Sequence, residues 1–400
     1  MPSIRIPERR PKLLFVFADD SFFWSHSLPV ARAALLAGYD VIAATGGDSY
    51  ARQIQDEGFR LIPLKLIRSS RSPLQELSAI RQLRQVYRLE HPEIVHNVAI
   101  KPVLYGSMAR LGLNGMSTLN EFAGLGYLVA SSSRKATFLR WLVWRALRFF
   151  LNRSNQQVLV ANQHDKQILT QRLGVDSERI LFTRGAGVDV HLFHPTPEPA
   201  GMPLVVFASR MLWIKGVQEF VEAARRLRAR GIAARFVLVG DADENNPSSV
   251  SRRELSEWQE EGTVEWWGQR RDMPHVFQQS SLVCLPSHGG EGIPKVLMEA
   301  GASGRAVVTT DVPGCRDIVR QGINGTVVQP RNVMALFEAI EKLLKDPVLR
   351  YKMGQHGRKI AVSEFSEEAV VEQTLAFYRE LLSPRTACLV QAQQSEASLR

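Results

Sequence analysis

The sequence predicts an α/β protein with two doubly wound parallel sheets. Three observations support this class. Short apolar runs alternate with amphipathic stretches, which is the strand–helix order of parallel sheets covered by helices. A proline-rich segment at 194–203 interrupts the alternation, which then restarts. The length of 400 residues exceeds what one compact core usually supports, so two domains are expected.

The first half shows the alternation clearly. A buried strand at its start leads into a helix that Gly38 ends, and a later helix carries apolar residues at helical spacing. The predicted strands are 12–18, 41–45, 60–66, 93–97, 157–162 and 179–184. The predicted helices are 25–39, 74–91 and 101–111.

The second half repeats the pattern after the linker. Helices lie between its predicted strands, which are 203–209, 235–240, 263–267, 281–286 and 306–310. We therefore expect an N-terminal domain over 1–196 and a C-terminal domain from 197. Ligands of such sheets bind at the carboxyl ends of the strands, so the cleft between the domains is the expected site.

The charge is unevenly spread. Lys plus Arg number 50 and Asp plus Glu 40, and residues 51–150 alone hold 15 basic and 6 acidic side chains. A basic excess indicates nucleic acid, an anionic membrane or phosphorylated ligands. No nucleic-acid recognition motif accompanies the charge, which disfavours that partner. Three sparse cysteines and no apolar run long enough to span a bilayer indicate a cytoplasmic protein that touches a membrane at most.

The segment from Glu291 to Glu299 carries readable chemistry. Pro294 suits a first helical turn, and Gly292 lets a ligand approach the backbone. The helix start offers N–H groups to a phosphate, and Glu299, about 7–8 Å along the axis, suits ribose hydroxyls. Glu291 could face a sugar beyond the phosphates. The alternative is a capped core helix with two surface glutamates.

A second element strengthens the functional interpretation. Arg210 and Lys215 lie in the loop between a predicted strand and helix, where two cations can neutralise a diphosphate leaving group. The alternative is two solvated surface cations. Their presence in the same domain as the Glu291–Glu299 segment makes that alternative less favoured.

With these motifs the chain resembles the family 4 (group 1) retaining glycosyltransferases of GT-B fold. Arg-x4-Lys-Gly at 210–216, FVLVGDAD at 236–243, E-x7-E at 291–299 and the run 307–330 carry the resemblance. The N-terminal half resembles the bacterial surface-polysaccharide branch (capsule, O-antigen or lipid-linked oligosaccharide), through 96–111, 124–129 and 184–195. The fold implied is two Rossmann-like domains facing across a cleft.

The resemblance implies a role for each residue. Arg210 and Lys215 would bind the donor diphosphate, Glu299 the ribose, and Glu291 the donor sugar. The backbone of Gly292, Ile293 and Pro294 would surround sugar and phosphate, with Glu291, Arg210 and Lys215 as the catalytic set. A terminal helix over 364–382 would return from the C-terminal domain (197–363) to the N-terminal one, leaving 383–400 as a tail.

Acceptor recognition departs from the family pattern. The first loop, 18–27, lacks the usual glycine pair, and Ala123 stands where many members have a histidine. His26, Asn120 and Glu121 are the acceptor-side candidates, whereas His96 is interpreted as structural. Asp241 and Asp243 resemble a metal motif of the other glycosyltransferase fold; their context argues against it, and we expect neither metal nor cofactor.

Two basic stretches are candidates for lipid contact. The segment 132–153 combines arginines with Trp141, Trp144 and Phe149, as in a helix that lies on an anionic leaflet. The alternative is a connecting helix with one face in the core. Lys65, Arg68 and Arg71 form a basic loop that could face a lipid diphosphate.

The favoured hypothesis is a retaining hexosyltransferase, peripheral on the inner face of the cytoplasmic membrane. It would use a nucleotide-sugar donor, a UDP-hexose or UDP-N-acetylhexosamine, and a polyprenyl-diphosphate-linked or other glycan acceptor. The alternatives are a UDP-sugar 2-epimerase-like enzyme and a non-catalytic nucleotide-sugar-binding protein. The sequence identifies neither the sugar, the acceptor, the linkage nor the oligomeric state.

Overall fold

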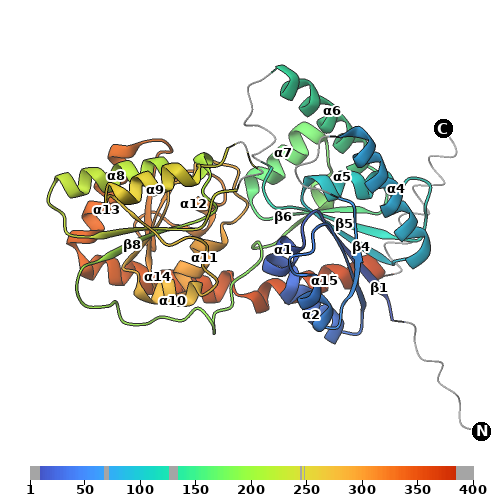
Figure 1. The fold of residues 1–400 in the computed structure, drawn as a ribbon. Helices are drawn as coiled ribbons and strands as arrows, with labels where there is room; N and C mark the ends of the chain where they lie inside the picture. The colour runs from blue at the N-terminus through green and yellow to red at the C-terminus, as the bar shows by residue number, and fades with distance from the viewer. Residues whose placement is uncertain (1–9, 67–71, 126–133, 244–245, 247, 384–400) are drawn as a thin grey trace, which may run out of the picture. The chain divides into compact units, whose positions relative to one another are not determined.

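The computed structural model describes residues 10–66, 72–125, 134–243, 246 and 248–383. Residues 134–139 are described by their helical backbone alone. Two compact units make up the chain (Figure 1). Unit 1 comprises the chain up to Thr183 and again from Val370 onward, and unit 2 comprises Arg184–Ala369. All but one residue of the predicted tail, 383–400, lies outside the described part.

Unit 1 contains a parallel seven-stranded sheet of order β3-β2-β1-β4-β5-β6-β7. Because the strand order reverses at β1, the sheet is doubly wound, and the carboxyl ends of its strands share one edge. The strands are β1 Lys12–Phe17, β2 Asp40–Thr45, β3 Arg60–Pro63, β4 Ile94–Val98, β5 Ser117–Phe122, β6 Gln156–Val160 and β7 Ile180–Phe182.

Helices cover both faces of this sheet. α4, α5 and α7 lie on one face, and α2 and α15 on the other (Figure 1). The α-helices are α1 Asp20–Phe22, α2 Leu28–Leu36, α3 Ala51–Asp56, α4 Pro73–Glu90, α5 Ile100–Ala109, α6 Arg134–Leu151, α7 Gln163–Leu173 and α15 Glu367–Leu382. A π-helical turn, η1, spans Phe23–Ser27, and a 3₁₀ turn, η3, spans Ser177–Arg179.

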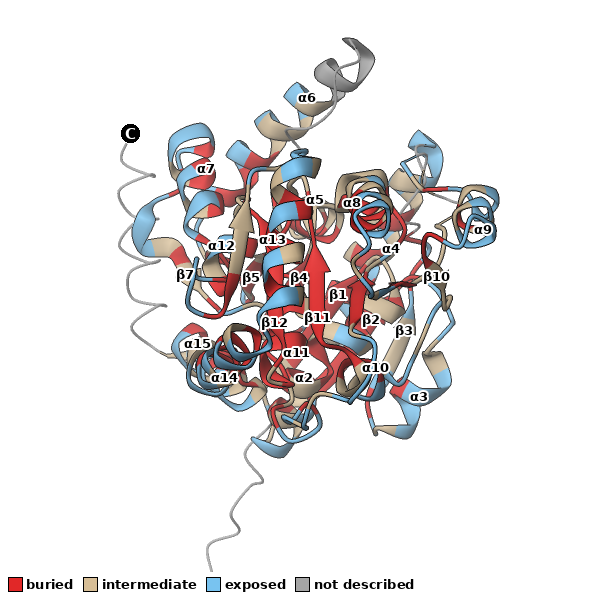
Figure 2. Cartoon of the chain, turned by 90° about the vertical axis from the view of Figure 1, so that its left-hand side faces the viewer, coloured by how far each residue is buried: buried red, intermediate tan, exposed pale blue. Residues whose placement is uncertain are grey.

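Unit 2 repeats the design with a parallel six-stranded sheet of order β10-β9-β8-β11-β12-β13. Its strands are β8 Leu204–Ala208, β9 Arg235–Val239, β10 Glu265–Trp266, β11 Leu282–Leu285, β12 Ala306–Thr310 and β13 Gly325–Val328. The central strands β8, β11 and β12 are buried, whereas the outer faces of the helices are exposed (Figure 2).

The helices of unit 2 divide between its two faces. α8 and α13 pack on one face, and α10, α11 and α14 on the other (Figure 1). The helices are η4 Trp213–Lys215 (3₁₀), α8 Val217–Ala229, α9 Arg252–Glu260, α10 Met273–Gln279, α11 Lys295–Ala302, α12 Cys315–Ile318, α13 Val333–Lys345 and α14 Pro347–Glu364.

Each predicted strand corresponds to an observed one, but two observed strands were not predicted. β5 was missed because its sequence, STLNEF, is polar, although its middle residues are buried. β13 was missed because it is short and begins at Gly325, a residue unfavourable in strands. A Cβ at Gly325 would lie 2.3 Å from the carbonyl oxygen of Val307, so the close approach to β12 requires glycine there.

The boundary between the units is a correction. The sequence predicted a change of domain after residue 196, whereas the units divide after Thr183. Val188 and Phe193 lie in the hydrophobic core of unit 2, and the N–H of Val188 donates to the carbonyl of Phe365 at 2.9 Å. The proline-rich segment is therefore bound along unit 2 and does not separate the units.

The second crossing also differs from the prediction. The sequence placed the terminal helix at 364–382, but α15 begins at Glu367 and the units divide before Val370. Tyr378 and Leu381 of this helix lie in the core of unit 1 with strand β1. The hydroxyl of Tyr378 lies 2.7 Å from Nδ1 of His96, so α15 is attached to β4 by a buried polar contact.

Candidate active site

Two loops at the carboxyl ends of neighbouring strands bring together a predicted cation and a predicted carboxylate. β8 and β11 pair in the sheet of unit 2. Lys215 follows β8 and Glu291 follows β11. Nζ of Lys215 lies 2.6 Å from Oε1 and 2.7 Å from Oε2 of Glu291. The ion pair thus joins the two motifs that the sequence presents 76 residues apart.

Glu291 is held in one orientation by a second donor. The hydroxyl of Ser287 donates to Oε1 of Glu291 at 2.7 Å. The side chain of Glu291 is 7% exposed and that of Lys215 17%, so water screens the pair little. The Ser287 carbonyl in turn accepts a hydrogen bond from the hydroxyl of Thr310 on β12. Ser287 is not predicted as a site residue, because a serine in a loop carries no distinguishing pattern.

A glycine lets the two loops approach each other. Gly216 has φ +77° and ends the turn that carries Lys215. A Cβ there would lie 2.0 Å from the carbonyl oxygen of Pro286, at the end of β11. The N–H of His288 also donates to the carbonyl of Ile214 at 2.8 Å. Backbone contacts therefore fix the spacing of the two loops before any ligand binds.

A further side-chain contact joins the same loops. Nε2 of His288 lies 3.0 Å from Oε1 of Glu219, in the first turn of α8, and both side chains are largely buried. Burial pushes the pKa of Glu219 upward, but the interactions with His288 and the backbone outweigh it and leave the pKa below its ordinary value. The sequence does not reveal this pair, since His288 follows β11 whereas Glu219 lies in α8.

Arg210 has a carboxylate partner of its own. Its Nη1 is 3.5 Å from Oδ2 of Asp243, and its side chain is 47% exposed. The neighbouring Asp241 accepts a hydrogen bond from Nη2 of Arg252 at 2.7 Å. The two aspartates of the metal-like motif thus face arginines. Within the described ranges, no group of three His, Cys, Asp or Glu side chains is arranged to hold a metal.

The start of α11 provides the backbone groups that the sequence predicts near a phosphate. The helix begins at Lys295, and Pro294 occupies its N-cap with extended backbone. Glu299 is the fifth residue of the helix. Burial raises the pKa of its carboxyl, which the charge of Lys295 lowers and that of Glu367 raises. Glu299 thus holds its proton to a higher pH than an ordinary glutamate.

The loop before α11 is packed closely by two other segments. A Cβ at Gly314 would lie 1.7 Å from the carbonyl oxygen of Gly292, so the loop after β12 approaches as backbone alone. A Cβ at Gly185 would lie 3.3 Å from Cβ of Ile293. Gly185, which the sequence predicted to belong to the N-terminal domain, therefore lies against the loop before α11 within unit 2.

The acceptor-side candidates lie in unit 1 and have different surroundings. His26 is in the π-helical turn η1, stacks on Phe22 with ring centroids 3.9 Å apart, and has Nδ1 2.7 Å from Oγ of Ser25. Such turns are frequent at functional sites. Glu121 is near the carboxyl end of β5, with Oε2 3.0 Å from Nε2 of His96.

Asn120 has a structural role in the sheet. It is fully buried; its oxygen accepts from Asn97 at 3.0 Å and its amide donates to Gln156 at 2.6 Å. Both polar ends of the side chain are therefore used inside the sheet, which corrects its selection as an acceptor-side residue. His96 is 2% exposed and contacts Tyr378 and Glu121, in agreement with its structural interpretation.

The basic stretches are only partly described. Arg68 and Arg71 lie outside the described residues, as does most of the segment 124–129. On α6, Trp141, Leu142 and Phe149 are more than half exposed, whereas Leu147 is buried. No helix among the described residues combines the length and the apolar run that a bilayer crossing requires.

Comparison with known families matches both halves of the chain. A family model described as "Glycosyl transferases group 1" matches residues 202–346, which include the Lys215–Glu291 pair and α11. A second model, "Glycosyl transferase 4-like", matches residues 12–162 of unit 1. The two matches together include every strand of both sheets except β7.

Individual relatives agree with these families. An N,N'-diacetylbacillosaminyl-diphospho-undecaprenol alpha-1,3-N-acetylgalactosaminyltransferase of Campylobacter jejuni is 26% identical over 89% of this chain and 95% of its own length. A UDP-Gal:alpha-D-GlcNAc-diphosphoundecaprenol alpha-1,3-galactosyltransferase of Escherichia coli is 23% identical over 78% of this chain and 81% of its own. The crystal structure of Anabaena Alr3699/HepE in complex with UDP superposes with a TM-score of 0.75 at 18% identity, covering 92% of this chain and all of that one. These similarities confirm two predictions, the GT-B fold class and the assignment of the chain as a glycosyltransferase.

Proposed function

Because the chain belongs to the group 1 glycosyltransferases, we propose that it is a retaining enzyme of surface-polysaccharide synthesis. It transfers a hexose or N-acetylhexosamine from a UDP-sugar to a glycan carried on polyprenyl diphosphate. Both relatives described above bear names with diphospho-undecaprenol acceptors and α-linked products, and one name specifies a UDP-sugar. Those names support the proposal for donor, acceptor and linkage type.

The observation that carries the proposal is the Lys215–Glu291 pair beside the start of α11. Nζ of Lys215 is 2.6 Å from Glu291 and little exposed, so a charged group is available in a poorly screened site. A diphosphate leaving group is stabilised there by the positive charge of Lys215 and by the N–H groups at the helix start. Arg210, on the same loop as Lys215, supplies the second cation.

The carboxylates take the remaining contacts of the donor. Glu299 accepts hydrogen bonds from the ribose hydroxyls, and Glu291, oriented by Ser287, accepts from the donor sugar. The backbone of Gly292, Ile293 and Pro294 lies between these two glutamates in sequence and surrounds sugar and phosphate. Since cations and a helix end balance the diphosphate charge, the proposed transfer reaction requires no metal ion or other cofactor.

The transfer step keeps the anomeric configuration. The acceptor hydroxyl forms a bond to the anomeric carbon on the side from which the diphosphate departs. The bond between that carbon and the phosphate oxygen breaks, and the leaving phosphate oxygen takes the acceptor proton. The charge that develops on the diphosphate is the part of the reaction that Lys215 and Arg210 stabilise. No side chain is required as a covalent nucleophile.

Unit 1 has the features expected of an acceptor side at a membrane. Arg145 lies over Trp141 and Arg153 over Phe149, so cationic and aromatic groups alternate along the exposed face of α6 and the turn that follows it. Exposed fractions of 53% for Trp141 and 56% for Phe149 leave these rings accessible to lipid headgroups. We therefore place the enzyme at the inner face of the cytoplasmic membrane as part of the proposal.

The direct test is a matrix of donors and acceptors. Purified full-length protein is incubated with UDP- or GDP-sugars and with short polyprenyl-diphosphate-linked mono- and disaccharides, and products are identified by mass spectrometry. The proposal expects one UDP-sugar to extend one lipid-linked acceptor. The transfer rate of a Glu299→Ala variant should be lower than that of wild type by at least about 100-fold, the effect expected when a charged transition-state contact is removed.

Two results would contradict the proposal. Conversion of a UDP-sugar to its epimer with no acceptor present would identify an epimerase. If no UDP- or GDP-sugar raises the melting temperature of the protein, the proposal that it binds a nucleotide-sugar donor is contradicted.

A further inference from the structure

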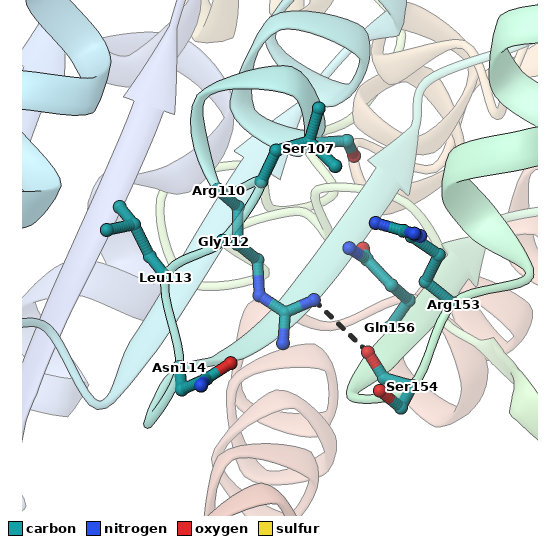
Figure 3. A pocket seen from close by; sticks show the side chains of 9 residues that line it. Ser107, Arg110, Gly112, Leu113, Asn114, Arg153, Ser154 and Gln156 are labelled. Carbon is teal, nitrogen blue, oxygen red and sulfur yellow. Dashed lines mark hydrogen bonds between the residues drawn. The ribbon is translucent and has the colours of Figure 1, made fainter. Parts of the chain in front are cut away.

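Unit 1 has a cavity at the edge of its sheet opposite to the carboxyl ends of the strands. It lies where β5 and β6 begin, between the loop that follows α5 and the loop that follows α6, and has a volume of about 290 Å³ (Figure 3). Its lining comes from residues 107–114 and 153–156. Ligands of doubly wound sheets bind at the other edge, so neither the donor nor the acceptor of the proposed reaction accounts for this cavity.

The cavity is lined by cations and contains no carboxylate. Arg110 and Arg153 both contribute to it, and their side chains lie around the same space (Figure 3). Neither arginine forms an ion pair with an acid among the described residues. Burial lowers the pKa of Arg110, the neighbouring Tyr87 raises it, and the like charge of Arg153 lowers it further. An anion between the two guanidinium groups would relieve that repulsion.

Two buried polar atoms at this cavity have no partner. The hydroxyl of Ser107, a residue only 3% exposed, makes no hydrogen bond, and neither does Nε of Arg110. Buried polar groups are hydrogen-bonded in the great majority of cases, so each exception requires an explanation. Both atoms have almost no exposed surface and no partner among the described residues, so a ligand with acceptor oxygens satisfies them once their side chains turn toward the cavity.

A third donor is oriented by the sheet. Gln156 is 2% exposed, and its oxygen accepts a hydrogen bond from the amide of Asn120 at 2.6 Å. With its oxygen engaged in this way, the NH₂ group of Gln156 is the end that remains for a ligand. Asn120 in turn is fixed by Asn97 at 3.0 Å. The buried chain of amides therefore presents a donor to the cavity.

The arginine at the centre of the cavity is held in place before any ligand binds. Nη1 of Arg110 donates to the carbonyl of Ser154 at 3.1 Å, and Nη2 donates to that of Met116 at 3.0 Å. Arg179 fixes the loop before β6 by donating to the carbonyls of Arg153 and Gln156, each at 2.6 Å. A site with oriented donors loses less entropy when it binds an anion.

We propose that this cavity binds a phosphate-bearing anion, contacted by Arg110, Arg153, Ser107 and the amide of Gln156. Phosphate suits the site because its several acceptor oxygens match guanidinium forks and hydroxyl donors. Two sources provide this chemistry: soluble phosphate, and the headgroup of an anionic phospholipid. Arg153 follows α6 and lies over the exposed ring of Phe149 on that helix, so both sources have access to its side chain.

The experiment titrates the full-length protein with inorganic phosphate by isothermal calorimetry and with vesicles by flotation. The vesicles contain phosphatidylcholine alone or with phosphatidic acid. Arg153→Gln should weaken binding of at least one probe by about 10-fold or more, the usual effect of losing one charged contact. Arg148→Gln, which removes the same charge from the exposed face of α6 and does not line the cavity, is the matched control.

Two further variants keep the test decisive. Lys215→Ala removes the other phosphate-binding group of the proposal and should leave binding at this cavity unchanged. Ser107→Ala should weaken binding and leave the fold intact, whereas Arg110 variants lose two backbone contacts and are avoided. Phosphate binding that requires Arg153 indicates a soluble ligand, and vesicle binding that requires Arg153 but not Arg148 indicates a headgroup. Equal affinities for both probes in wild type and Arg153→Gln, or no saturable binding of either, would overturn the proposal.

Discussion

Replacing Lys215 by alanine should reduce both activity and stability, and the structure gives the size of each effect. Nζ of Lys215 lies 2.6 and 2.7 Å from the two carboxylate oxygens of Glu291, and the two side chains are 17% and 7% exposed. Removing one partner of a buried pair leaves an uncompensated charge and costs about 3–5 kcal/mol. Because Ser287 still donates to Glu291, we expect the lower end, about 3 kcal/mol. Activity should fall by about 100-fold or more, through loss of a charge that stabilises the leaving diphosphate.

A second substitution separates the two effects. Glu291→Gln in the Lys215→Ala background replaces the unpaired carboxylate by a neutral amide. Most of the lost stability should return, whereas activity should stay at or below that of the single variant. Lys345→Ala is the matched control, since Lys345 pairs with Glu341 at 2.8 Å in the same unit but is 59% exposed. A pair whose lysine is this exposed should contribute little stability, and Glu341 keeps Arg230 as a second partner.

Stability is measured by urea unfolding followed by tryptophan fluorescence, and activity as the initial rate of nucleotide release with saturating acceptor. Wild-type turnover in Lys215→Ala would refute the assignment of Lys215 to the donor diphosphate. A double variant no more stable than the single one would refute the argument that an unpaired Glu291 is the cause of the instability.

Three further predictions follow from the same structure. Glu299→Gln should weaken UDP binding by about 100-fold in calorimetry, through loss of charged hydrogen bonds. Because the pKa of Glu299 lies above its ordinary 4.5, wild-type protein should bind UDP less well as the pH falls through that pKa. Over the same pH interval the wild type should gain stability relative to the variant. Gly216→Ala should lower the melting temperature far more than Gly231→Ala, because both have φ +77° but only the Gly216 Cβ meets a carbonyl, at 2.0 Å; equal losses would show that the left-handed backbone alone is responsible. Tyr378→Phe should cost about 1–3 kcal/mol of unfolding free energy, since it leaves buried His96 without its 2.7 Å partner, and should not change UDP affinity; a changed affinity would contradict the structural role of this contact.

The pH prediction depends on the direction of the Glu299 shift. A carboxyl whose folded pKa is raised binds more protons in the native state than in the unfolded chain. Native stability therefore rises as the pH is lowered toward 4.5, the ordinary value, and the gain ends below it. UDP binding changes in the opposite sense, because only the ionised carboxylate accepts hydrogen bonds from both ribose hydroxyls.

The donor motifs could be identified from sequence because each is local. Pro294, Glu299 and the helix between them follow one another in the chain, so spacing alone predicts their arrangement. The contact between Lys215 and Glu291 could not be derived in this way. It depends on β8 and β11 being neighbours in the sheet, and on Gly216 passing Pro286 at backbone distance.

The predictions for Asn120 and for the domain boundary were wrong because the sequence does not show which polar residues are buried. Asn120 looks like a polar residue at a strand end, but its amide is satisfied by Asn97 and Gln156 inside the sheet. Only the register of three strands reveals this, because β4, β5 and β6 align those side chains. The predicted domain boundary failed for a related reason. The proline-rich segment looks like a linker, yet Arg350 pairs with Glu198 at 2.5 Å and attaches it to unit 2.

The anomeric configuration of the product tests the central claim most directly. The protein is given the UDP-α-sugar that it accepts and its lipid-linked acceptor. The coupling between H1 and H2 of the transferred sugar is then measured by NMR as soon as the product has formed. The account predicts an α-linked product, formed by wild type and strongly reduced in Lys215→Ala. A β-linked product would contradict retaining transfer, and with it the departure of the diphosphate from the face that the acceptor attacks.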